Sequence, residues 1–325
     1  MRKIGFAAAA AAACLLASGV ALAARGSDPP PPWAFIVLQD ESDPPPTTKL
    51  ITVPGSTLYV TEKAVDDPFA IIDWFPEDHL RMPRVVAQGH RPRPWACGYC
   101  HLATGLGDPA SAALAGLPAA YIEQQLVEFR AGRRQCAVAK TGCAVAMPQV
   151  ARAVSAADAK AAAIYFSKLR YHSRIHVVEA SMVPKTRYGS LYPIRLESGR
   201  EEPLGLRILE MPDSVELEED DDWRVPVTAY VPPGSVARGN ALVRSGAGAL
   251  PCASCHGALL QGDGTVPPLA GRPPTYIVRQ LYDIQYGYRR GAAVAPMEPE
   301  VAHLTAQERI DIAAYIASVR PSGTP

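Results

Sequence analysis

The sequence has no excess of charge of either sign and, beyond its first residues, no long hydrophobic run. Its 32 lysines and arginines balance 32 aspartates and glutamates over 325 residues. Proteins that bind nucleic acids gather basic residues to meet the phosphates, so this balance gives no reason to expect a nucleic-acid partner. Residues 24–325 contain no run of about 20 apolar residues, which a membrane-spanning helix needs. We therefore expect contact with a membrane only through protein partners.

The one long apolar run stands at the start of the chain. Arg2 and Lys3 precede an alanine-rich segment over residues 4–22, and an Ala-Leu-Ala triplet ends at Ala23. This is the pattern of a secretory signal peptide over residues 1–23. An uncleaved anchor helix is the alternative, because about 20 apolar residues can just span a bilayer. We expect cleavage and a location in the periplasm.

Cysteine is scarce, and four of the seven cysteines fall within two copies of one pentapeptide, Cys-x-x-Cys-His. The residues concerned are Cys97, Cys100 and His101 in the first copy and Cys252, Cys255 and His256 in the second. The pentapeptide is the attachment signature of c-type haem, in which both thiols bond to the porphyrin and the histidine binds the iron. A zinc site or a thiol redox site needs only Cys-x-x-Cys, so the histidine favours haem. The sequence thus predicts two covalently bound c-type haems.

The two motifs begin a longer internal repeat. Tyr121 and Tyr276 each follow the histidine of their motif by 20 residues. Matching positions then recur at helical spacing, which predicts an amphipathic helix whose apolar stripe packs a core in each copy. These positions are Ile122, Gln125, Leu126 and Phe129 in the first copy and Ile277, Gln280, Leu281 and Ile284 in the second.

Each copy ends in the same way. Met147 and Met297 lie beside prolines, which predicts a loop at each methionine. Ser155-x-x-Asp158 follows the first methionine and Thr305-x-x-Glu308 the second. Both patterns match the capping box that opens a helix, the first with Asp in place of Glu.

This order of haem motif, helix, methionine loop and closing helix resembles class I cytochrome c domains. The tandem arrangement is similar to dihaem cytochromes of the cytochrome c4 type. The resemblance covers residues 77–171 and 236–321, and it implies a mainly α-helical protein of two tandem cytochrome c domains. Residues 24–76 form an N-terminal extension outside it, and residues 172–235 are too long for a simple linker.

The resemblance also implies the ligands of the two irons. His101 and His256 would bind on one side, and the thioethers of Met147 and Met297 on the other. The alternative for each methionine is that it fills a gap in the core.

Two further cysteines, Cys136 and Cys143, lie in a loop that is longer in the first copy. In an oxidising compartment they can form a disulfide, and two free thiols are the alternative. His79 and His90 precede the first motif within a basic run that could pair with haem propionates or a partner, or be a solvated loop. The arginines of this run are Arg81, Arg84, Arg91 and Arg93.

The segment over residues 172–235 contains short apolar runs at 174–178 and 225–231, which predict strands in an inserted lobe. An acidic run from Glu216 to Asp222 reads either as a docking patch for a basic redox protein or as a solvated loop. Residues 51–60 and 69–75 predict a small packed element before the first haem motif.

Taken together, these features predict a periplasmic dihaem cytochrome that carries single electrons and has no catalytic residues of its own. Its donor would be a periplasmic dehydrogenase or a quinol-oxidising complex, and its acceptor a terminal oxidase or another cytochrome. Two alternatives remain open. The chain could be the electron-transfer subunit of a dehydrogenase complex, or a dihaem peroxidase. Methionine at both irons argues against the peroxidase, because a six-coordinate iron binds peroxide poorly.

Overall fold

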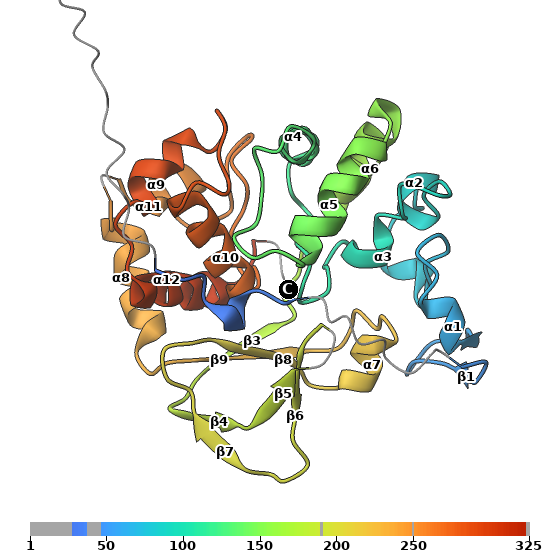
Figure 1. Ribbon diagram of the computed structural model, residues 1–325, viewed down its shortest axis with the longest axis horizontal. Helices are drawn as coiled ribbons and strands as arrows, with labels where there is room; N and C mark the ends of the chain where they lie inside the picture. The colour runs from blue at the N-terminus through green and yellow to red at the C-terminus, as the bar shows by residue number, and fades with distance from the viewer. Residues whose placement is uncertain (1–27, 38–46, 189–190, 249, 323–325) are drawn as a thin grey trace, which may run out of the picture.

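The computed structural model describes residues 28–37, 47–188, 191–248 and 250–322. Two helical units lie side by side, and the segment between them in the sequence forms a β lobe below both (Figure 1). The predicted class, mainly α with a partly β insertion, is confirmed. Within the described ranges no helix has the length and apolar character needed to cross a membrane. The predicted signal peptide lies outside these ranges.

The first unit contains five helices around one core. They are α2 (Arg84–Ala87), α3 (Gly98–His101), α4 (Ala119–Arg130), α5 (Gly142–Ala153) and α6 (Ala156–Lys168). Helix α6 begins where the sequence predicts, because the hydroxyl of Ser155 accepts a hydrogen bond from the backbone N–H of Asp158. Its inner face buries Phe166 against the residues that follow the haem motif, including Leu102.

The second unit repeats this order with a longer first helix. Its elements are α8 (Ser235–Ser245), α9 (Cys252–His256), α10 (Pro274–Gln285), the 3-10 helix η3 (Ala295–Met297), α11 (Glu298–Val301) and α12 (Ala306–Ser318). Thr305 and Glu308 form the predicted capping box of α12. Helix α8 crosses α12 at Gly239, where an added Cβ would lie 1.9 Å from the carbonyl oxygen of Asp311. Only glycine allows the two helices to approach so closely.

The β lobe is centred on a three-stranded sheet of order β3-β9-β8. Strand β9 (Val227–Val231) pairs in parallel with β3 (Ile175–Glu179) and antiparallel with β8 (Leu209–Pro212). Both strands predicted from the apolar runs are thus present. Two antiparallel pairs complete the lobe, β4 (Met182–Pro184) with β7 (Glu201–Pro203) and β5 (Thr186–Tyr188) with β6 (Pro193–Arg195).

The acidic run of the lobe, in which Glu216 and Glu219 are exposed, is divided between surface and interior, and its role in docking stays a prediction. It forms α7 (Val215–Glu219), which turns Glu218 inward. The buried Glu218 carboxylate accepts from both terminal nitrogens of Arg174, at 2.8 and 3.0 Å. Asp222 is buried as well. The carboxylates of Glu218 and Asp222 are therefore inside the protein and do not face a partner.

The N-terminal extension divides between the two units. The 3-10 helix η1 (Pro32–Ala34) belongs to the second unit, because Ala34 and Phe35 are buried in its core and Arg279 donates to the Ala34 carbonyl at 2.8 Å. The next part packs on the first unit, where Trp74 and Phe75 are buried. Its elements are β1 (Leu50–Ile51), β2 (Val60–Thr61), α1 (Glu62–Val65) and the 3-10 helix η2 (Pro76–Asp78).

The lobe contacts both units. Arg174 donates to the carbonyl of Gly107 in the first unit at 3.1 Å. In the second unit, the buried carboxylate of Glu210 accepts from the hydroxyl of Thr275 at 2.7 Å, at the start of α10. The lobe therefore holds the two units together from outside.

Candidate haem sites and the interface between them

The first haem motif holds its histidine in a fixed orientation. His101 ends α3 and is only 8% exposed. Its Nδ1 lies 2.8 Å from the carbonyl oxygen of Ala112, and the ring of Phe166 packs edge-on at 6.2 Å between ring centroids. An Nδ1 that donates to a carbonyl fixes the tautomer and leaves the Nε2 lone pair for a metal.

The second motif repeats this geometry. His256 ends α9 and is 5% exposed, and its Nδ1 lies 2.9 Å from the carbonyl oxygen of Pro267. Both carbonyls come 11 residues after their histidine. Burial lowers the pKa of both His101 and His256, which favours the neutral imidazole that metals bind.

Three of the four cysteines in the motifs do not have the character of reactive thiols. Burial raises the pKa of Cys97 to about 12 and also raises the pKa values of Cys100 and Cys252. Catalytic and redox-active cysteines show the opposite shift. Over the part of the chain that the structure describes, no group of three or more His, Cys, Asp or Glu is placed to hold a metal ion. The donor set thus fits haem better than zinc or thiol exchange.

The two methionines expected as sixth ligands stand on different elements. Met297 ends η3 and packs against the core of the second unit. Met147 lies inside α5, together with Pro148. The prediction of a loop at Met147 is wrong. Helix α5 forms in spite of the proline because Thr141 caps its N-terminus and Arg130 donates to carbonyls at its C-terminal end.

Cys136 and Cys143 are joined in a disulfide, with their Cα atoms 6.1 Å apart. Cys143 belongs to the first turn of α5, and Cys136 lies in the loop before it. The bond therefore ties this loop to the helix that carries Met147.

The basic run before the first motif is only partly a solvated loop, because three of its four arginines are exposed while its histidines contact the rest of the first unit. The imidazole of His79 is only 2% exposed. His90 Nε2 lies 3.3 Å from the carboxylate of Asp158 at the start of α6. Arg91 pairs with the carboxylate of Asp67 at 2.8 Å. This segment is thus tied to the unit that follows it.

A polar network joins the two units, and its members are equivalent positions of the repeat. They are Tyr121, Gln125 and Arg134 in the first unit and Tyr276, Gln280 and Arg289 in the second, separated by the same shift as the two haem motifs. Gln125 and Gln280 were predicted to pack an apolar stripe, and this is wrong. The recurrence of an arginine after each helix was the signal in the sequence that could have revealed the network.

Each arginine of the network binds its own unit and the other one. Arg134 donates to the side-chain oxygen of Gln125 at 2.8 Å and to the hydroxyl of Tyr276 at 3.3 Å. The reciprocal bonds run from Arg289 to the side-chain oxygen of Gln280 at 2.9 Å and to the hydroxyl of Tyr121 at 2.9 Å. Arg134 and Arg289 also form an antiparallel β-bridge. The interface therefore has an approximate two-fold symmetry.

Further cations are buried at this interface. Arg272 of the second unit donates to the carbonyls of Ala113 and Ala115 in the first, at 2.7 and 2.8 Å. The Nε atoms of Arg272 and Arg289 are buried and have no hydrogen-bond partner in the described structure. Burial raises the pKa of the nearby Asp283 carboxyl to about 7, which weakens it as a counter-charge. Buried cations need anionic partners, and haem propionates would supply them.

Comparisons with known proteins agree with this geometry. A family model described as "Cytochrome c" matches residues 236–320. Cytochrome c-554(548) of Halomonas halodenitrificans is 35% identical over 68 residues, which are 21% of this chain and 82% of that protein. The chain belongs to the cytochrome c family. Cytochrome c4 of Thiocapsa roseopersicina is 43% identical over 70 residues, 21% of this chain and 33% of that protein.

A longer alignment covers both units. The thiosulfate dehydrogenase electron acceptor of Thiomonas intermedia is 27% identical over 230 residues, which are 70% of this chain and 80% of that protein. Among solved structures, thiosulfate dehydrogenase from Marichromatium purpuratum matches with 28% identity and a TM-score of 0.48, over 73% of this chain. This chain spans 39% of the length of that one. The predicted resemblance to cytochrome c4 is confirmed, and the protein is an electron carrier with covalently bound c-type haem.

Proposed function

We propose that this cytochrome is a periplasmic carrier that takes single electrons from a dehydrogenase and delivers them to a terminal acceptor. The observation that carries the proposal is the repeated histidine geometry, in two units that share one buried polar interface. The signal-peptide pattern of residues 1–23 supports the location. Bound haem iron supplies reversible one-electron chemistry.

The protein residues orient and tune this chemistry. His101 and His256 present Nε2 while a carbonyl holds Nδ1. Arg134 and Arg289 lie buried between the units and would provide positive charge for propionates. We assign the sixth positions to Met147 and Met297, because both occupy the same place in the repeat. Thioether ligands raise the reduction potential and keep small ligands away from the iron.

The ligand assignment has a direct spectroscopic test. Oxidised protein is expected to show the weak far-red band that is typical of a methionine sulfur on haem iron. Met147→Ala and Met297→Ala should each remove about half of this band, whereas Met182→Ala, in the β lobe, should leave it unchanged. If either ligand variant keeps the full band, that methionine does not bind iron.

For the donor, we propose a thiosulfate dehydrogenase. The support is the alignment with the Thiomonas protein named as the electron acceptor of that enzyme, which extends over 80% of it. The test is rapid mixing of the oxidised cytochrome with a thiosulfate dehydrogenase and thiosulfate, followed by the absorbance of reduced haem. Reduction that requires both enzyme and thiosulfate would support the assignment. Reduction by a quinol-oxidising complex and not by the dehydrogenase would contradict it.

The peroxidase alternative is tested on the same preparation. Reduced protein mixed with hydrogen peroxide should show no rapid reoxidation, because both irons would have six ligands. Met147→Ala and Met297→Ala would open one position each and should then allow it. Rapid turnover of peroxide by the unaltered protein would make this chain an enzyme.

A further inference from the structure

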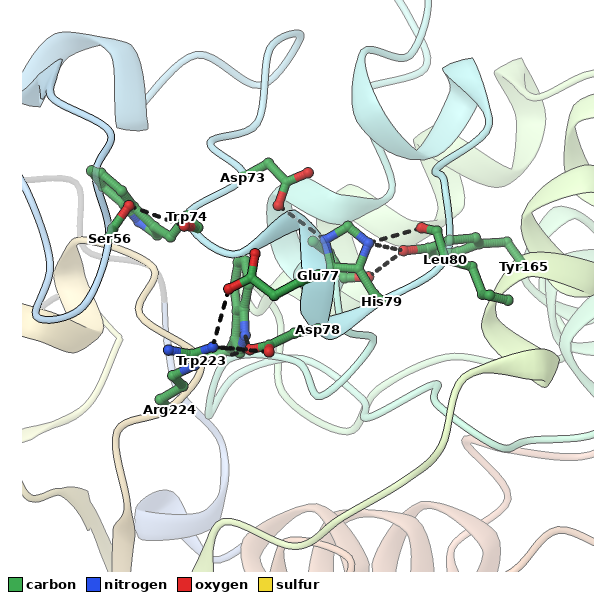
Figure 2. Close-up of polar contacts among 11 residues, drawn as sticks. Ser56, Asp73, Trp74, Glu77, Asp78, His79, Leu80, Tyr165, Trp223 and Arg224 are labelled. Atoms are coloured by element: carbon green, nitrogen blue, oxygen red, sulfur yellow. Dashed lines mark hydrogen bonds and ion pairs between the residues drawn. The ribbon is translucent and has the colours of Figure 1, made fainter.

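A buried histidine before the first haem motif has acceptors on both ring nitrogens. Figure 2 shows His79 between Asp73, Leu80 and Tyr165. Its Nε2 lies 3.0 Å from the carboxylate of Asp73, and its Nδ1 lies 2.8 Å from the carbonyl of Leu80. A carboxylate and a carbonyl only accept hydrogen bonds, so both contacts are satisfied together only by the doubly protonated imidazolium.

The hydroxyl of Tyr165 connects this histidine to the haem motif. It donates to the carbonyl of Ala103 at 2.6 Å, and its oxygen lies 3.2 Å from Nδ1 of His79. The hydroxyl has one hydrogen, and while His79 is protonated that hydrogen is used on Ala103. When Nδ1 loses its proton, its lone pair becomes a second acceptor for Tyr165. The protonation of His79 therefore sets which acceptors are available to the hydroxyl of Tyr165.

This contact lies close to an iron ligand along the chain. Ala103 is two residues after His101, and Phe166, the neighbour of Tyr165 in α6, packs on the His101 ring. A change at the Ala103 carbonyl is thus transmitted to the segment that holds His101.

The charges around His79 favour its protonated form. Burial opposes the imidazolium, but the Asp73 carboxylate and the Leu80 carbonyl outweigh burial and raise the pKa of His79 above its ordinary value. Asp78 adds a negative charge from the same segment. On the lobe side, the ring of Trp223 packs edge-on at 5.9 Å, and its neighbour Arg224 is paired with Asp78.

The second unit has the same tyrosine in another setting. Tyr315 occupies the place of Tyr165 in the closing helix, but its hydroxyl accepts from Arg244 of α8 at 3.3 Å. Tyr315 is also more exposed than Tyr165, which is buried. The two units thus differ at one polar contact behind an otherwise repeated haem motif.

We propose that His79 is a positioning residue that acts through Tyr165 and makes the reduction potential of the first haem, and not of the second, depend on pH. The proposal rests on the family assignment and on His101, and it is independent of which dehydrogenase is the donor. A protonated His79 disfavours the more positive oxidised iron. The reduction potential of the first haem should therefore fall as the pH rises through the pKa of His79. Well below and well above that pKa, the potential should not change with pH.

The experiment is a redox titration of the holoprotein over a series of pH values. The two haems are distinguished by NMR signals, with contacts to Phe166 identifying the first. His79→Gln, which is polar but does not titrate, should remove the pH dependence of the first potential. Tyr165→Phe should weaken it, because the connection to Ala103 is lost while the charge of His79 remains. Tyr315→Phe is the matched control and should leave both potentials unchanged.

Three results would overturn the proposal. The first is a potential of the first haem that still depends on pH in His79→Gln as it does in the unaltered protein. The second is the same undiminished pH dependence in Tyr165→Phe. The third is an equal effect of His79→Gln on the potentials of both haems. If a variant fails to bind haem, NMR titration of the His79 ring in the unaltered protein decides instead. Linkage requires a higher pKa of His79 in the reduced protein than in the oxidised one. Equal values in both states would contradict the proposal.

Discussion

The two cytochrome units orient their histidines in the same way, but different parts of the chain pack around them. In the second unit the packing comes from α8 and α12, which both belong to that unit and cross at Gly239. In the first unit the corresponding position is Arg84, which is exposed and begins the four-residue helix α2. The first unit replaces the missing helix with segments from elsewhere, namely Trp74 and Phe75 of the extension and Trp223 of the lobe.

This difference indicates which parts of the unit the haem motif needs. Both copies keep the histidine, the carbonyl that accepts from Nδ1, and the closing helix. The first helix of the unit can be exchanged for other apolar surface. The extension and the lobe are therefore structural parts of the first unit, and we expect that unit to depend on them for stability.

The largest effect should follow from Trp223→Ala. Trp223 is 1% exposed, packs edge-on against Phe75 at 5.6 Å and donates to the carboxylate of Asp78 at 3.0 Å. Removing a buried tryptophan costs about 3–5 kcal/mol. Hydrogen exchange measured by mass spectrometry should show faster exchange in α6 and unchanged exchange in α12.

Trp33→Ala is the matched control, because Trp33 packs against the core of the second unit. It should increase exchange in the second unit and not in the first. Equal effects of both variants on both units would show that the protein unfolds as one cooperative block, and that the two units do not differ in what stabilises them.

The next largest effect is expected at the polar network that the two units share. Arg289→Gln removes a buried cation that binds Gln280 and Tyr121. Loss of a buried charged hydrogen bond costs about 1.5–3 kcal/mol. Because the network joins both units, we expect its positive charge to act on both haems, so both reduction potentials should fall together. Redox titration checks this, with Arg290→Gln as the control. A shift of one potential alone would contradict a shared network.

Much of this architecture follows from local signals. The haem motifs, the capping residues Ser155 and Thr305, and the strands near residues 175 and 227 are encoded within short stretches of sequence. Local pattern also predicted a disulfide between Cys136 and Cys143, which the structure contains. In these cases the residues that decide the structure are neighbours in sequence.

The remaining features depend on contacts between distant residues. Nothing near Phe35 shows that it packs against Tyr282 of the second unit. The helical state of Met147 depends on Arg130, which caps the end of α5 from another helix. The sequence around His79 gives no sign that its ring is buried, because its partner Tyr165 lies 86 positions further along the chain.

A smaller stability effect is expected at the close crossing of the second unit. Gly239→Ala would place a Cβ within 2.8 Å of the Cβ of Tyr315 and still closer to the Asp311 backbone, so α8 and α12 must separate. Overpacking of this kind costs about 1–3 kcal/mol. Arg84→Ala at the equivalent place in the first unit should have little effect. Thermal unfolding of both variants tests the contrast, which is refuted if Gly239→Ala unfolds like the unaltered protein.

The smallest effect is a pH dependence of the contact between the lobe and the first unit. Hydrogen bonds from Arg224 and Trp223 lower the pKa of Asp78. A carboxylate with a lowered pKa stabilises the fold above its unfolded pKa of about 3.9, and this contribution is lost as the pH falls through the folded value. Because Arg224 and Asp78 are partly exposed, solvent screening limits the effect to about 1 kcal/mol or less.

Hydrogen exchange of α7 and η2 should therefore accelerate on acidification. Asp78→Asn should show the faster exchange already at neutral pH and little further change in acid. If acid accelerates exchange equally in Asp78→Asn and the unaltered protein, another group is responsible, and the lobe is not held to the first unit through this carboxylate.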